Sequence, residues 1–87
     1  MYVGLDVSKK EIVCVGEDKN GNVVYENTLG VTRDDIDNLV KSIGRNSVFA
    51  VEASTKGVFV YDCLAAKNAN VKMVNPNRLT RSRLRGA

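Results

Sequence analysis

The sequence contains no histidine and no tryptophan, and it has only two cysteines among 87 residues. The lack of histidine excludes a histidine general base, a Ser-His-Asp triad and histidine ligands for a metal. Cys14 and Cys63 do not form a Cys-x-x-Cys motif, so neither a zinc site nor a disulfide scaffold is supported. Both lie in apolar runs and are expected to be small core residues, as suits a reducing cytoplasm. Any metal is therefore expected to have oxygen or sulfur ligands.

Long apolar runs are also missing. The chain is 44% hydrophobic and 26% charged, which is typical of one small globular domain rather than a disordered chain. No run approaches the roughly 20 apolar residues of a membrane span. Charged residues between positions 6 and 11 interrupt the apolar start, so no signal peptide is expected. We expect a cytoplasmic protein without a membrane partner, with a core over residues 1–76 and a basic tail over 77–87.

Acidic residues are absent after Asp62. Residues 1–62 carry ten acids and seven bases, whereas residues 63–87 carry six bases and no acid. This asymmetry indicates a polyanionic partner such as DNA, although a merely solvated tail would have the same composition. No aromatic residue interleaves with the basic tail, so a base-stacking platform is not supported. The candidate phosphate contacts are Lys9, Lys67, Lys72, Arg78, Arg81, Arg83 and Arg85.

The first third of the chain predicts an antiparallel meander. Apolar residues alternate over 2–7 and recur over 11–16 and 23–29, as in short strands. Asn20-Gly21, between the second and third of these segments, is a strong tight-turn signal.

The remainder predicts two helices alternating with two strands. Apolar residues repeat with helical spacing over 32–43, and Thr32 is placed to cap that helix. An almost wholly apolar run over 47–51 predicts a strand buried on both faces. A second helix over 56–66, capped by the serine or threonine before it, and a last strand over 70–74 complete the pattern.

This order of elements predicts a mixed α/β sheet. The right-handed crossover rule makes the last two strands parallel neighbours. If the first helix crosses back over the meander, the fourth strand lies beside the first. The strand order is then 3-2-1-4-5, which is the ribonuclease H-like arrangement. Asp6 near the end of the first strand and Glu52 at the end of the fourth would emerge at the same sheet edge, where ligand sites of open α/β sheets lie.

Asp6 and Glu52 are the candidate catalytic and metal-binding residues. Carboxylate oxygens are ligands that Mg²⁺ or Mn²⁺ accepts, and such ions activate water and stabilise the leaving oxygen in phosphodiester cleavage. Each acid also has a structural alternative. Asp6 would form an Asx turn with the amides of Ser8 or Lys9. Glu52 would pair with Lys56 or cap the following helix. The other acids singled out are expected in turns, caps and surface positions: Glu17, Asp18, Glu26, Asp34, Asp35, Asp37 and Asp62.

Three segments carry a family resemblance. Residues 2–10, Tyr-Val-Gly-Leu-Asp-Val-Ser-Lys-Lys, resemble the opening of the DEDD-type insertion-sequence transposases, the group that includes the Piv-type DNA invertases. Residues 51–54, Val-Glu-Ala-Ser, resemble the family's Glu-Ala-Ser/Thr segment. Residues 74–78, Val-Asn-Pro-Asn-Arg, resemble its Val-Asn-Pro segment, which a basic stretch follows. The three occur in the family's order, and together they span essentially the whole chain.

The resemblance implies a RuvC-like domain of a recombinase that cuts and rejoins DNA, with a guide RNA as a candidate partner. Asp6 and Glu52 would be the first two metal-binding acids of the DEDD set. The family's remaining two acids follow the basic stretch, beyond Ala87. The segment 55–59 only approximates the family's Gly-x-Tyr/Trp pattern. We therefore expect an N-terminal part of the catalytic domain that binds metal weakly and does not cleave DNA alone.

Two other functions remain open from the sequence. Residues 4–9 are also similar to the first phosphate loop of actin-like ATPases and sugar kinases, but no second glycine-rich loop follows. A non-catalytic module that forms homo-oligomers through an apolar edge or face is the other alternative.

Overall fold

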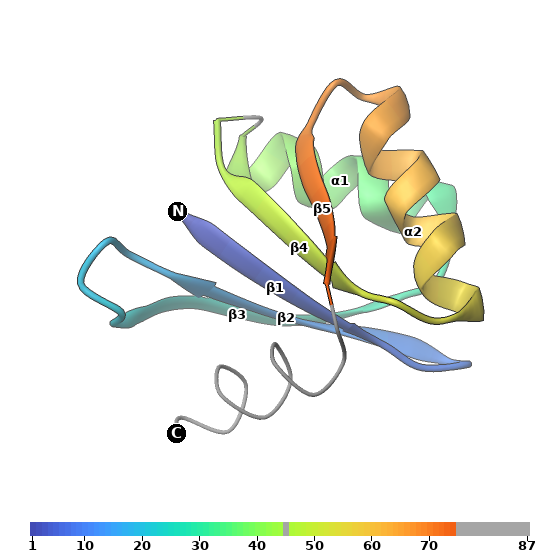
Figure 1. The fold of residues 1–87 in the computed structure, drawn as a ribbon, viewed down its shortest axis with the longest axis horizontal. Helices are drawn as coiled ribbons and strands as arrows, with labels where there is room; N and C mark the ends of the chain where they lie inside the picture. Colours follow the sequence, from blue (N-terminus) through green and yellow to red (C-terminus); the bar gives the residue numbers. More distant parts are fainter. Residues whose placement is uncertain (45, 75–87) are drawn as a thin grey trace.

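A computed structural model describes residues 1–44 and 46–74 (Figure 1). Its elements are β1 (Tyr2–Val7), β2 (Glu11–Glu17), β3 (Val23–Gly30), α1 (Arg33–Ile43), β4 (Val48–Glu52), α2 (Thr55–Ala66) and β5 (Asn70–Val74). Every element expected within these residues is present, and the observed ends lie within one residue of those predicted. The basic tail over 77–87 lies outside the described residues. Within the described part, no helix is long and apolar enough to cross a membrane.

The five strands form one mixed sheet in the order β3-β2-β1-β4-β5. β1 pairs with β2 in antiparallel and with β4 in parallel, and β4 and β5 are also parallel (Figure 1). This confirms the predicted ribonuclease H-like order. β1 is thus the strand at which the antiparallel meander and the parallel half of the sheet join.

The tight turn predicted from Asn20-Gly21 is present between β2 and β3. Gly21 has φ +84°, a conformation that suits glycine. The Asp18 N–H donates to the carbonyl of Asn22 at 2.9 Å, and the Asp18 carboxylate accepts from the N–H of Asn20 at 2.8 Å. Hydrogen bonds from Asn22, together with those from Asn20 and Gly21, lower the pKa of Asp18. Asp18 is therefore a turn residue, as predicted.

Both helices cover the same face of the sheet (Figure 1). Because side chains alternate along a strand, every second residue of β1, β2 and β4 enters this core. Fully buried strand side chains here pack with those of the two helices: Val3, Leu5, Ile12, Cys14, Phe49, Val51, Ile36, Val60 and Leu64. The intervening residues of β1 and β4 lie on the opposite face, which no described helix covers.

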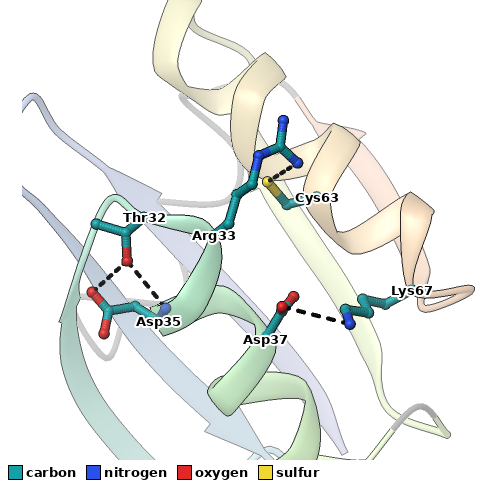
Figure 2. A network of polar contacts seen from close by, with 6 residues as sticks. All are labelled: Thr32, Arg33, Asp35, Asp37, Cys63 and Lys67. Atoms are coloured by element: carbon teal, nitrogen blue, oxygen red, sulfur yellow. Dashed lines mark hydrogen bonds and ion pairs between the residues drawn. The ribbon is translucent and has the colours of Figure 1, made fainter.

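The two cysteines belong to this core, as the sequence predicted. Both are free and buried. Burial raises the pKa of the Cys14 thiol to about 12, so the reactive thiolate is scarce near neutral pH. The Cys63 sulfur accepts a hydrogen bond from the Arg33 guanidinium at 3.7 Å, and the same guanidinium lies 5.5 Å from the ring centre of Phe59 (Figure 2). These contacts join the start of α1 to α2.

Thr32 caps α1 through its side chain (Figure 2). Its hydroxyl oxygen accepts from the Asp35 N–H at 3.1 Å and donates to the Asp35 carboxylate at 2.9 Å. Asp34 and Asp35 also place negative charge at the positive end of the helix dipole.

Thr32→Ala is expected to lower the free energy of unfolding by about 1 kcal/mol, because one helix N–H loses its acceptor. Urea unfolding followed by circular dichroism measures the change. Ser42→Ala is the matched control, since Ser42 is exposed in the last turn of the same helix and donates only to the Asn38 carbonyl. Equal losses in both variants would contradict the role of the cap.

Candidate metal centre

Asp6 and Glu52 occupy neighbouring positions on two parallel strands. Leu5 lies opposite Val51 in the β1–β4 pairing, and each acid directly follows one of these residues. Residues in register share a face, and adjacent strands lie about 4.8 Å apart. Both carboxylates are therefore on the face away from the helices, at the carboxyl ends of their strands. Both side chains are partly buried.

Apolar residues flank the two acids across the sheet. Val13 lies opposite Asp6 on β2, and Val74 lies opposite Glu52 on β5. Gly4 and Ala50, which precede the acids on the same face, are both buried. Asp6 and Glu52 are thus the acidic residues of β1 and β4 on this face, and their cross-strand partners on β2 and β5 are valines.

The turn after β1 is closed by hydrogen bonds between Ser8 and Glu11. The Ser8 N–H donates to the Glu11 carbonyl at 2.9 Å, and the Ser8 hydroxyl accepts from the Glu11 N–H at 3.2 Å. The Ser8 amide, one of the two considered for an Asx turn at Asp6, therefore serves the β1–β2 turn.

The start of α2 corrects one of the alternatives suggested for Glu52. Ser54 is the N-cap, and its hydroxyl accepts from the Gly57 N–H at 3.0 Å. Ser54, and not Glu52, therefore caps α2.

Gly57 is a site residue that the sequence reading missed. A Cβ built on Gly57 would collide with the carbonyl oxygen of Glu52 and would lie 3.0 Å from the Ser54 Oγ. The first turn of α2 therefore packs directly on the end of β4 and fixes the backbone of Glu52. The available signal was a glycine inside a predicted helix, which is unfavourable unless close packing requires it.

Glu17 corrects one expectation. It was placed among turn and surface residues, but it is the last residue of β2, lies opposite Tyr2 and is only 7% exposed. It shares the face of Asp6, because its partner Tyr2 and Asp6 are both even-numbered residues of β1 and so lie on one face. Its pairing partner is four residues before Asp6, so the two acids are roughly 13 Å apart along the strands. Glu17 is therefore too far from Asp6 to share an ion with it.

The described candidate phosphate contacts do not all lie on one side of the structure. Lys9 lies in the β1–β2 turn beside the carboxylates, and Lys72 lies on β5 opposite Ala50 on the same face. Lys67 is at the far end of α2, with its ammonium 3.5 Å from the Asp37 carboxylate (Figure 2). Lys67 is therefore remote from Asp6 and Glu52. The four arginines at 78, 81, 83 and 85 lie outside the described residues.

The chemical type of the two donor groups suits a hard divalent cation. Two carboxylates from neighbouring strands are ligands that Mg²⁺ and Mn²⁺ accept. Within the part of the chain that the structure describes, no group of three or more acidic or sulfur-bearing side chains is gathered to hold a metal ion. The described residues thus bring together two candidate ligands, Asp6 and Glu52.

The sheet order and its two crossover helices define a ribonuclease H-like domain. The family model of the DEDD transposases of the IS110 type, described as a transposase, matches residues 3–87. The chain therefore belongs to this transposase family, and the resemblance found in its three motifs is confirmed. A search of curated proteins found no match to the chain. The family match favours the transposase interpretation over the kinase-like and oligomerisation alternatives.

Proposed function

We propose that this chain supplies two metal-binding carboxylates, Asp6 and Glu52, to a site that cuts and rejoins DNA. The observation that carries the proposal is the parallel β1–β4 pairing, which sets these acids side by side at the ends of their strands. Membership of a transposase family supports DNA as the substrate. When bound, Mg²⁺ supplies charge neutralisation at the scissile phosphate and activation of the attacking water. Asp6 and Glu52 would hold the ion, while the close packing of Gly57 in α2 against the Glu52 carbonyl keeps the backbone of Glu52 in position.

Basic residues would hold the DNA backbone. Lys9 and Lys72 lie on the side of the carboxylates, and the arginines of the basic tail over 77–87 would add further phosphate contacts. Such contacts produce a steep salt dependence but carry no sequence information. Target choice therefore falls to another component, for which a guide RNA is our candidate.

Two carboxylates leave most of the coordination shell of Mg²⁺ to water, because the ion demands six oxygen ligands. We infer that this chain alone binds divalent metal weakly and does not cleave DNA. Further acidic ligands would be needed to complete the site.

The test is a Mn²⁺ titration followed by NMR on the ¹⁵N-labelled chain. Paramagnetic line broadening is expected at the amides around Asp6 and Glu52, and it is expected to disappear in Asp6→Asn and in Glu52→Gln. Asp62→Asn is the matched control, because it removes one exposed carboxylate from α2 and should leave the broadening unchanged. Broadening that persists in both site variants, or that spreads evenly over all acids, would overturn the proposal.

A further inference from the structure

A hollow of about 450 Å³ is formed by two segments that meet at one edge of the sheet. It is lined by Val7, Ser8 and Lys9 from the β1–β2 turn and by Ser54 and Lys56 from the start of α2. Asp6 directly precedes the first of these segments, and Glu52 lies two residues before the second. The hollow is therefore placed where β1 and β4 end.

Two lysines from different segments converge on this hollow. Lys9 and Lys56 are exposed, and both line it. Two like charges around one hollow repel each other, and the attraction of both to an anion bound between them would outweigh that repulsion.

The backbone that carries these lysines is fixed by local hydrogen bonds. The Ser8 hydroxyl both donates to the Glu11 carbonyl at 3.0 Å and accepts from the Glu11 N–H at 3.2 Å, which closes the turn containing Lys9. The Ser54 cap and the close packing of Gly57 on the Glu52 carbonyl fix the turn containing Lys56. Only the flexible lysine stems must adjust to a ligand.

We propose that this hollow binds a backbone phosphate of the DNA strand held at Asp6 and Glu52, with Lys9 and Lys56 on either side of it. The inference rests on the proposed function, because it takes the adjacent carboxylates to act on a phosphodiester. A DNA strand presents one phosphate per nucleotide, so a strand at the carboxylates offers a neighbouring phosphate to the hollow. Lysine binds phosphate as a point charge and needs no fixed geometry. Lys9 and Lys56 are thus positioning residues for the strand.

The first test measures DNA binding in the presence of EDTA, so that it does not depend on the metal. Fluorescence anisotropy with a short labelled duplex gives the binding constant over a range of salt concentrations. For the Lys9→Gln/Lys56→Gln double variant, the slope of log K against log salt is expected to fall by about 0.9, the value for one lost phosphate contact. Lys19→Gln/Lys41→Gln removes the same charge from exposed positions of the β2–β3 turn and α1, and its slope should not change.

The second test uses inorganic phosphate and NMR. The amides of Lys9 and Lys56 are expected to shift saturably in the unmodified chain and not in the double variant. The proposal is overturned if the double variant keeps its salt slope, if the control variant loses as much, or if phosphate shifts neither amide. Failure of the metal proposal has a different signature, because Asp6→Asn would then keep its Mn²⁺ broadening while DNA binding in EDTA was unaffected.

Discussion

Phe49→Ala is expected to remove about 3–5 kcal/mol from the free energy of unfolding, the usual cost of truncating a buried phenylalanine. Phe49 is the largest of the fully buried side chains among the described residues. It lies on β4, and its side chain packs between the sheet and the helices. Its removal would leave a cavity that β4, held between β1 and β5, cannot close. A domain of this size has a total stability of about 5–15 kcal/mol, so the variant is expected to be at the margin of folding.

Thermal and urea unfolding followed by circular dichroism measure this loss. The melting temperature is expected to fall by roughly 15–30 °C, since each kcal/mol corresponds to several degrees in a domain this small. Val24→Ala is the control, because Val24 is 58% exposed on β3 and its truncation should change the stability by less than about 0.5 kcal/mol. A loss below about 1.5 kcal/mol for Phe49→Ala would show that the core does not close around this ring.

Gly57→Ala is expected to destabilise the domain by about 3 kcal/mol, at the upper end of the usual cost of overpacking. The new methyl group would collide with a backbone carbonyl, that of Glu52, which cannot rotate away as a side chain can. The gain in helix propensity from alanine, about 1 kcal/mol, offsets only part of this cost. Relief of the collision requires α2 or the end of β4 to move, so Mn²⁺ broadening at Glu52 should weaken as well.

Gly30→Ala is the matched control for Gly57→Ala. A Cβ at Gly30 would meet the Asp35 carboxylate at 2.7 Å, but that group lies at the end of a side chain that can turn aside. Its unfolding free energy is expected to change by less than about 1 kcal/mol. If the two glycine variants were equally stable, the close packing of α2 on β4 would be refuted.

The sequence predicted the fold well because local and long-range signals agree. The alternation over β1, the Asn20-Gly21 turn and the helical spacing in α1 each indicate one structure, and the right-handed crossover rule then allows few sheet orders. The adjacency of Asp6 and Glu52 follows from that order, since both acids lie near the ends of β1 and β4, which become neighbours when α1 crosses back over the meander.

Other features depend on contacts between segments distant in sequence, which no periodicity encodes. In the sequence, Lys67 resembles the other basic residues near the C-terminal end. Only the packing of α1 against α2 shows that it pairs with Asp37. Glu17 reads as part of a polar turn, but the strand continues through it and buries it. The hollow between Lys9 and Lys56 likewise exists only because two turns separated by more than 40 residues meet at one edge of the sheet.

The position of β1 between β2 and β4 also has a consequence for the order of folding. β1, β2 and β3 are joined by short turns, and closing short loops costs little chain entropy. The pairing of β1 with β4 is instead expected to follow the ordering of the meander and α1, because non-local contacts form against a larger entropic cost. Asp6 and Glu52 lie on the two sides of this late junction. A partly folded chain that has only the meander would therefore carry one of the two proposed metal ligands, and metal affinity that appeared during refolding would report when the sheet closes.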